Sequence, residues 1–538
     1  MKRFIWITLI VILAGFLRFY HVSTVPPALN SDEVAIGYNA YSILKTGRDE
    51  YGIRFPLTFR SFDDYKMPVY VYMVAGSMKI FGYTDFAVRF PSAFFGTLTV
   101  LLTYFFAKEL LKRHDVACVS AFFLAISPWS LQFSRSGYEA NVAVFFIVLG
   151  VYLFLKQRWW LLLSSISLSI AIWTYLTPRI FVPLLALGLG VIYWKELWKQ
   201  KYFVLGAIFI AIMLLWPIAR MTISPEGQMR ATGVSAFANP DDLKKSVMRI
   251  ALDKTNGFGI FTVFDNRRVT YAITFLRGYF SHFDPNFLFL DKSINKYRAP
   301  DMGLLYLFEL PFIVTGVYML VRKWSGGSAV LFWWVLAAPV AAAFTLQLPH
   351  PVRTLVFLPA FQILSAVGFV AIWNKFRRIR ALIVVGILLF VVYYLHQYYI
   401  FLPVENAGDW YVGRREMTEK INSMKDRYDT VYVSNSLDFP YIFYLYYSPI
   451  DPMIYQQQGG TVSGGFEEQK NNAGNVQFRS INTSLCVPRK KKLFVGLPGQ
   501  LFKNSKILDS VKYPDGSVAI IFFECPLPGD EGFTEVFL

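Results

Sequence analysis

Residues 203–219 read FVLGAIFIAIMLLWPIA, a run of seventeen residues without a charged side chain. A helix needs roughly 20 mostly apolar residues to cross a bilayer, and about 17 is a working minimum. Comparable runs recur through the first 400 of the 538 residues. Over the whole chain 55% of residues are apolar and 17% are charged, whereas soluble domains contain about 25% charged residues. This composition excludes a soluble enzyme, a disordered chain and a secreted disulfide scaffold, and it predicts a polytopic membrane protein.

Eleven apolar stretches are predicted to cross the membrane as helices. They are residues 4–20, 89–111, 116–133, 140–155, 159–176, 179–194, 203–219, 303–321, 328–346, 353–373 and 381–402. A shorter apolar segment, residues 67–82, carries Lys79. We expect it to form an amphipathic helix, from Met67 to Phe81, that lies in the membrane interface.

The basic residues indicate how these spans are oriented. If the N-terminus is cytoplasmic, fifteen Lys and Arg residues fall in short cytoplasmic segments, as the positive-inside rule requires. We therefore expect a multi-pass protein of the plasma (inner) membrane with its N-terminus in the cytoplasm, and we expect residues 1–20 to be a retained span rather than a signal peptide. The excess of Lys and Arg in cytoplasmic segments also accounts for the net charge of +17. The positive charge therefore does not indicate a nucleic-acid partner, and none is predicted.

The composition changes after residue 402, where long apolar runs end. Short strand and helix patterns and a turn at Pro514-Asp515-Gly516 predict a small α/β domain over residues 403–538, outside the cytoplasm. The Gly-, Gln- and Asn-rich stretch 456–478 is expected to be a mobile loop. For Cys486 and Cys525, both a disulfide bond and two free thiols are left open.

The predicted fold class is therefore mainly α. A transmembrane domain of about 11 helices would cover residues 1–402, with long outside loops at residues 21–88 and 220–302. Interfacial helices would lie in the first of these loops, and the small α/β domain would follow.

Two adjacent carboxylates, Asp32 and Glu33, lie in the first long loop shortly after the first span and open a short helical pattern. Near a membrane surface a carboxylate can have a raised pKa and act as a proton acceptor. The alternative is structural. Asn30 or Ser31 would cap the helix, and the two acidic residues would complement the positive end of its dipole.

The sequence Asp64-Tyr65-Lys66-Met67-Pro68 follows in the same loop. A lysine just before a helix that begins with proline suits a phosphate bound at the interface, because its ammonium group acts as a compact positive charge. The alternative is that Lys66 only reaches up to the lipid headgroups while its aliphatic stem lies against lipid.

Three further residues are weaker candidates. Arg135 would bind phosphate, or would pair with Glu139 four residues later. Arg353, in a turn between two spans, would bind phosphate or reach to the headgroups. His282 would bind a metal ion together with Asp64, or would simply be a solvated loop histidine.

In their order along the chain, these motifs resemble the membrane glycosyltransferases of the C-type fold that use polyprenyl-phosphate sugars, a superfamily that contains protein O-mannosyltransferases and lipid A aminoarabinose transferases. The resemblance covers residues 1–220 by motif and the rest by topology. The matching sequences are Asp32-Glu33, Lys66-Met67-Pro68-Val69-Tyr70, Ala87-Val88-Arg89-Phe90-Pro91-Ser92-Ala93, Ser127-Pro128-Trp129, and Ser134-Arg135 with Glu139.

The resemblance implies an inverting glycosyltransferase that moves a hexose or pentose from a polyprenyl-phosphate donor to an extracytoplasmic lipid, glycan or protein. It implies that Asp32 is the catalytic base, that Glu33 supports it, and that Lys66 contacts the carrier phosphate. The aminoarabinose enzymes place a metal-binding Glu directly before that lysine, whereas this chain has Tyr65. A divalent metal ion is therefore left open as a cofactor.

Two other functions are compatible with the same spans. A transporter or flippase of lipid-linked sugars would share the long loops, although it should show repeated halves or broken spans in matching positions, and neither pattern is visible. A non-catalytic membrane scaffold of the same topology is the other alternative.

Overall fold

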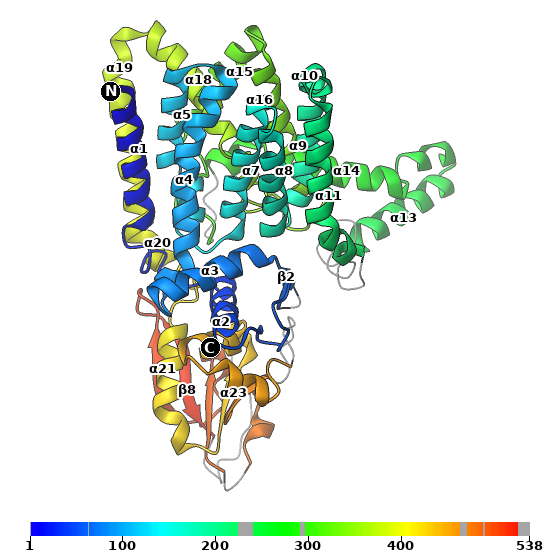
Figure 1. Ribbon diagram of the computed structural model, residues 1–538. Coiled ribbons are helices and arrows are strands. Elements are labelled where there is room, and N and C mark those ends of the chain that lie inside the picture. The colour runs from blue at the N-terminus through cyan, green and yellow to red at the C-terminus, as the bar shows by residue number, and fades with distance from the viewer. Residues whose placement is uncertain are drawn as a thin grey trace.

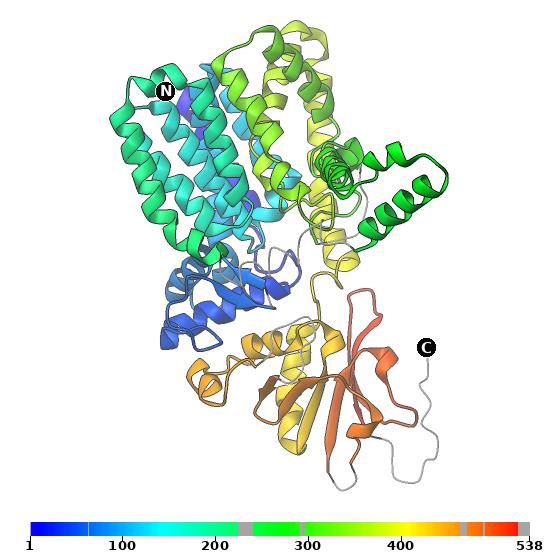
Figure 2. The ribbon, with the colours of Figure 1, turned by 90° about the vertical axis from the view of Figure 1, so that its right-hand side faces the viewer.

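The computed structural model of the protein describes residues 2–62, 64–223, 240–290, 296–462, 471–487 and 490–525. Most of the chain forms a bundle of long helices, and a mixed sheet lies beyond one end of that bundle (Figure 1). Between them lies a middle layer that contains the helices α2 (Ser31–Thr46) and α3 (Pro68–Phe81), and Figure 2 shows the same three parts from the side. The mainly helical fold class is confirmed.

The bundle is built from apolar helices joined by short turns. Its helices are α1 (Lys2–Phe19), α4 (Asp85–Leu111), α5 (His114–Ile126), α6 (Pro128–Ser134), α7 (Glu139–Lys156), α8 (Trp160–Thr174), α9 (Pro178–Ile192), α10 (Trp194–Trp198), α11 (Lys201–Ile223), α15 (Glu309–Arg322), α16 (Gly326–Ala337), α17 (Val340–Ala343), α18 (Ala360–Lys375), α19 (Arg380–His396) and α20 (Leu402–Glu405).

Six helical segments in the described part of the chain are long and apolar enough to cross a bilayer. The number becomes seven if α5 and α6, which meet at an angle of 56°, count as one broken span. Shorter apolar helices lie at Ile5–Phe19, Trp160–Thr174 and Pro178–Ile192. The structure therefore supports a multi-pass membrane protein, while the count of eleven crossings stays a prediction.

Helices α15 and α18 cross very closely because both carry a glycine at the crossing point. A Cβ atom added to Gly316 would lie 2.1 Å from the Leu364 carbonyl oxygen, and one added to Gly368 would lie 1.9 Å from the Phe312 carbonyl oxygen. Small residues allow this backbone approach, which is a common way to pack helices in a membrane.

The sheet follows the bundle in the chain and contains six strands in the order β4-β5-β3-β6-β8-β7. The strands β5, β3 and β6 are parallel, whereas β4, β8 and β7 each pair antiparallel with a neighbour. The elements of this region are α21 (Arg414–Met424), β3 (Thr430–Ser434), α22 (Pro440–Tyr447), α23 (Pro452–Gln457), β4 (Asn471–Ala473), β5 (Val476–Arg479), β6 (Lys492–Gly496), β7 (Ile507–Lys512) and β8 (Val518–Glu524).

Two sequence predictions for this region are settled by the structure. The stretch 456–478 is not wholly a loop, because β4 and β5 form within it and pair with each other. Residues 463–470 lie outside the described residues. Cys486 and Cys525 form a disulfide bond.

The middle layer and the sheet region share one hydrophobic core. Buried residues of α2 and α3, such as Ile36 and Val74, belong to the same cluster as Tyr446 of α22. Glu50, in the loop after α2, is 1% exposed and accepts hydrogen bonds from Asn39 Nδ2 at 2.9 Å and from Thr461 Oγ1 at 2.8 Å. The domain boundary at residue 402 stays a prediction, because the segments on its two sides pack together.

Candidate active site

The first turn of α2 is fixed by a reciprocal cap. The Asn30 side chain accepts a hydrogen bond from the Glu33 backbone N–H at 3.1 Å, and the Glu33 carboxylate accepts one from the Asn30 N–H at 2.9 Å. This capping box satisfies two N–H groups that a helix end otherwise leaves open. Asn30 is therefore the cap, and Asp32, which lies between these two residues, does not serve that function.

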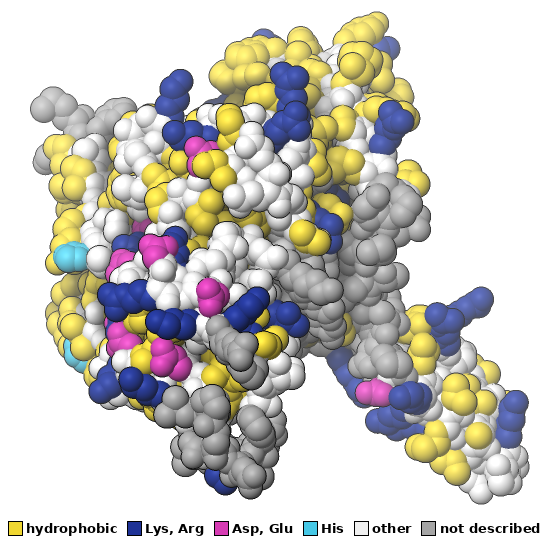
Figure 3. Space-filling model, turned by 90° about the horizontal axis from the view of Figure 1, so that it is seen from below, with side chains coloured by type: hydrophobic (Ala, Val, Ile, Leu, Met, Phe, Trp, Pro, Cys, Tyr) yellow, Lys and Arg dark blue, Asp and Glu magenta, His cyan; other side chains and the backbone are white. Residues whose placement is uncertain are grey.

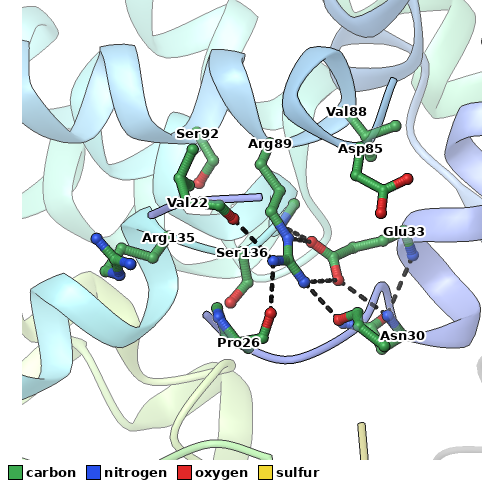
Figure 4. A network of polar contacts seen from close by, with 12 residues as sticks. Val22, Pro26, Asn30, Glu33, Asp85, Val88, Arg89, Ser92, Arg135 and Ser136 are labelled. Atoms are coloured by element: carbon green, nitrogen blue, oxygen red, sulfur yellow. Dashed lines mark hydrogen bonds and ion pairs between the residues drawn. The ribbon is translucent and has the colours of Figure 1, made fainter. Parts of the chain in front are cut away.

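Glu33 is enclosed by hydrogen-bond donors and has no exposed side-chain surface (Figure 4). Its Oε1 accepts from Arg89 Nε at 2.9 Å and from the Gly137 N–H at 2.7 Å. Its Oε2 accepts from Arg89 Nη2 at 3.2 Å as well as from Asn30. Since protein donors occupy all these positions, the geometry does not favour the predicted catalytic role of Glu33, which stays a prediction. Glu33 instead ties α2 to α4 and to the turn before α7.

Arg89 completes this network from the start of α4. It is fully buried and donates to the backbone carbonyl oxygens of Val22 and Pro26, both at 2.9 Å, and of Ala28 at 2.5 Å. A buried guanidinium with this many partners fixes the path of the chain between α1 and α2. The network therefore sets the position from which Asp32 faces the neighbouring cavity.

Asp32 and Lys66 form an ion pair in a cavity of about 310 Å³. Lys66 Nζ lies 2.5 Å from Asp32 Oδ1, and the side chains are 9% and 38% exposed, respectively. Lys66 is held there by a short hairpin in which β1 (Phe59–Ser61) pairs with β2 (Asp64–Lys66). The lining residues come from separate parts of the chain and include Asp32, Tyr65, Lys66, Met67, Tyr138, Glu139, Tyr175, Thr177, Tyr297, His350 and Arg353.

Lys296 is a second cation near Asp32, and sequence reasoning did not find it. Burial opposes ionisation of Asp32, but attraction by Lys66 and Lys296 outweighs it, so the pKa of Asp32 lies below its ordinary value. Burial also opposes the charge of Lys296, and attraction by Asp32 outweighs it, so the pKa of Lys296 is raised. Gln132 of α6 holds this segment by donating to the Lys296 carbonyl oxygen at 2.7 Å.

Two buried polar groups at the cavity lack a hydrogen-bond partner among the residues that the structure describes. Within the described part of the chain, neither the Tyr138 hydroxyl nor His350 Nδ1 makes a hydrogen bond. Burial, followed by repulsion from Arg353, lowers the pKa of His350 to about 3, so its imidazole is neutral. Buried polar atoms without partners are rare and require an explanation, which a bound ligand would supply.

The structure brings Arg353 to this cavity and places Arg135 elsewhere. Arg353 lines the cavity and donates from Nη1 to Thr345 Oγ1 at 2.7 Å. Arg135 is 1% exposed and donates to the Leu17 and Val25 carbonyl oxygens at 2.6 and 2.9 Å. Because it is bound to backbone near the end of α1, the prediction that Arg135 binds the carrier phosphate is not supported. It has a structural role.

The metal candidates do not form a site in the described residues. His282 is buried, with Nδ1 2.7 Å from the Gly278 carbonyl oxygen and Nε2 accepting the His350 N–H at 3.2 Å, so both ring nitrogens are engaged and a metal-ligand role stays a prediction that this geometry does not favour. The Asp64 side chain lies outside the described residues. No group of three His, Cys, Asp or Glu residues in the described ranges could hold a metal ion.

The cavity residues that the sequence analysis missed share one weak signal. Lys296 and Tyr297 stand together in the second long loop, where basic and aromatic residues are interspersed. The neighbouring sequence does not distinguish them from other basic–aromatic pairs. Their place beside Asp32 depends on long-range contacts, namely the packing of Tyr297 near Phe133 and the hydrogen bond that Gln132 donates to the Lys296 carbonyl oxygen.

Known proteins resemble this chain in part of its sequence and in its fold. The family described as dolichyl-phosphate-mannose-protein mannosyltransferase matches residues 65–219. An uncharacterized protein of Aquifex aeolicus is 29% identical over 163 residues, which are 28% of this chain and 32% of that protein. Dolichyl-phosphooligosaccharide-protein glycotransferase 2 of Archaeoglobus fulgidus is 28% identical over 145 residues, which are 26% of this chain and 24% of that protein. The matches thus span a third or less of these relatives.

Among solved structures, ArnT from Cupriavidus metallidurans shares the fold over almost the whole chain. Its apo structure has a TM-score of 0.55 at 14% identity and covers 97% of this chain and 98% of ArnT. Its structure with undecaprenyl phosphate has a TM-score of 0.54 at 14% identity, with 96% and 98% coverage. The resemblance predicted from the sequence motifs is therefore confirmed, and the chain has the C-type fold found in glycosyltransferases that use polyprenyl-phosphate-linked donors.

Proposed function

We propose that this protein transfers a sugar from a polyprenyl-phosphate donor to an acceptor outside the cytoplasm. In this proposal Asp32 is the base that accepts the proton of the acceptor. Lys66 and Arg353, with Lys296, bind the phosphate of the donor. The observation that carries the proposal is the carboxylate of Asp32 lying 2.5 Å from Lys66 in a cavity that Arg353 also lines.

The size and lining of the cavity support a phosphorylated sugar as the ligand. About 310 Å³ lies at the lower end of the range for small-molecule sites. Cationic side chains suit the phosphate, and the Tyr138 hydroxyl and His350 Nδ1 are available to hydroxyl groups of a sugar.

An apolar groove near the cavity supports a lipid carrier. The groove measures about 500 Å³ and is lined by Leu57, Pro68, Val69, Tyr72, Met73 and Trp173. Pro68 directly follows Met67, which lines the cavity, so the groove and the cavity both reach the start of α3. An isoprenoid chain would fill this groove while its phosphate reaches Lys66.

The ion pair between Lys66 and Asp32 suggests how donor binding would activate the base. A donor phosphate that attracts Lys66 would weaken the pair and add negative charge near Asp32. Both effects raise the pKa of Asp32 from its depressed value toward that of a useful base. The acceptor would then attack the anomeric carbon from the face opposite the phosphate, the bond to the phosphate oxygen would break, and the configuration would invert.

The proposal includes a topology in which the N-terminus is cytoplasmic and residues 403–538 lie outside. It leaves the acceptor as a lipid, a glycan or a protein. The structures of ArnT include one bound to undecaprenyl phosphate, and this supports a donor of the same chemical class.

The experiment that tests the proposal compares the lipid-linked sugars of cells with and without the protein. A transferase predicts that one polyprenyl-phosphate sugar accumulates in its absence and that one glycan or lipid loses a sugar. Purified protein should then release polyprenyl phosphate from that donor. A flippase would instead move the donor across vesicle membranes without cleaving it, and this result would contradict the proposal.

A further inference from the structure

A helical arm leaves the bundle sideways, alongside the half of the bundle nearer the sheet (Figures 1 and 2). It consists of α13 (Pro240–Thr255), a helical turn η2 (Gly259–Val263) and α14 (Arg267–Ser281). Only the C-terminal half of α14 is seated on the bundle, where the Tyr279 hydroxyl donates to the Leu336 carbonyl oxygen at 2.8 Å. An element that projects laterally beside helices apolar enough to cross a bilayer is placed where it can contact the surrounding lipid.

The tip of the arm exposes large apolar side chains. Ile260 is 80% exposed, and Phe258, Phe261, Val263 and Phe264 are each at least half exposed. A contiguous apolar patch of this kind marks a membrane or protein contact. On the rest of the arm, apolar and basic side chains are interspersed, as Figure 3 shows from the side of the sheet.

A small cavity of about 90 Å³ lies between the two helices of the arm and is lined by cations. Lys245 and Arg249 of α13 and Arg277 of α14 line it, together with Ser246 and Thr270. Arg249 lies 3.2 Å from Asp265, which also lines the cavity. Within the described residues, Lys245 and Arg277 have no carboxylate partner. The volume is about three times the share of one liquid water, which is roughly 30 Å³, and therefore suits a group of a few heavy atoms.

The arm as a whole is positively charged, as is the lining of its cavity. Residues 240–281 contain seven Lys and Arg and four Asp residues, a net charge of +3. Amphipathic helices with basic residues beside large apolar ones lie in the membrane interface and prefer anionic lipids.

We propose that the arm lies in the membrane interface and binds the phosphate headgroup of an anionic phospholipid in the cavity formed by Lys245, Arg249 and Arg277. The apolar tip enters the acyl region, and the three cations hold the phosphodiester. This assignment is independent of the transfer reaction, because none of these residues lines the cavity around Asp32.

The test uses the full chain in nanodiscs of phosphatidylcholine, alone or mixed with phosphatidylglycerol. A fluorophore that responds to polarity is attached at Ile260→Cys in a Cys118→Ser background, in which Cys486 and Cys525 stay paired. We expect blue-shifted emission that shifts further with phosphatidylglycerol. The variant Lys245→Gln/Arg249→Gln/Arg277→Gln should lose the phosphatidylglycerol-dependent part, because it removes the three cations that line the cavity and would hold the phosphate.

The matched control removes three other charges from the same helices, Lys244→Gln/Arg267→Gln/Arg268→Gln, and should keep most of the phosphatidylglycerol response. Equal loss in both triple variants would mean that net charge alone matters and would overturn the headgroup cavity. Equal responses of both variants and the parent would overturn it too. A label that stays as polar as in water in every nanodisc would overturn the membrane contact itself.

Discussion

Asp32 and Glu33 are adjacent carboxylates, and the same chemical change in each should have a different consequence. Asp32→Asn and Glu33→Gln both remove one negative charge and barely alter size. Asp32 faces a cavity, is 38% exposed and does not cap α2. Glu33 is fully buried and accepts hydrogen bonds from Arg89, Gly137 and Asn30. The pair of variants therefore separates a base from a structural carboxylate.

The structure sets the size of each effect. Asp32→Asn removes the charge that faces Lys66, whose side chain is 9% exposed, but its amide oxygen can still accept the same hydrogen bond, so the free energy of unfolding should fall by only about 1 kcal/mol. Transfer should fall by at least about 100-fold, because a general base contributes ~10²–10⁴-fold and an amide cannot accept the proton. Glu33→Gln places an N–H₂ group against two donors whichever way the amide turns, and it leaves the Arg89 charge buried and unpaired. The loss of stability should be about 3–5 kcal/mol.

Two measurements on purified protein check this prediction. Thermal unfolding in nanodiscs gives the stability of each variant, and release of polyprenyl phosphate from a labelled donor gives the rate. Asp32→Asn should unfold at nearly the parent temperature, bind donor and fail to transfer, whereas Glu33→Gln should unfold at a clearly lower temperature. Near-normal transfer by Asp32→Asn, or parent-like stability of Glu33→Gln, would refute the assignment of the two carboxylates.

Four further outcomes are expected. Lys66→Ala should weaken donor binding by ~1.5–3 kcal/mol, and Lys66→Arg should retain part of it, as titration with the lipid donor will measure. Burial raises the pKa of Glu50 from 4.5 to about 7, so the charged form destabilises the folded state. The free energy of unfolding should therefore fall, by on the order of 3 kcal/mol, as the pH rises from about 4.5 to about 7, and unfolding curves of Glu50→Gln should lack this dependence. Replacing Cys486 and Cys525 by Ser opens a link across 39 residues and should lower that free energy by about 4 kcal/mol in denaturant titrations. Arg135→Gln should lower the unfolding temperature yet leave donor affinity in the folded fraction unchanged, and a selective loss of donor affinity would restore its predicted phosphate contact.

Much of the architecture could be predicted because its signals are local. Exposing a long apolar run such as residues 203–219 to water is unfavourable, so composition alone predicts that it crosses a bilayer. The turn at Asp515-Gly516 predicts the hairpin that β7 and β8 form. The sequence offers both Asn30 and Ser31 as caps of α2, and the reciprocal bond with Glu33 selects Asn30.

The candidate site could be predicted only in part, since long-range packing decides it. The sequence by itself pointed to Asp32, Lys66 and Arg353, whose residue types and positions outside the apolar runs suit a phosphate. Only the tertiary structure decided that Glu33 is enclosed by Arg89 and that Lys296 lies near Asp32. The physical reason is that burial and the partners of a charge depend on segments far apart in the chain, and a sequence pattern does not contain their distances.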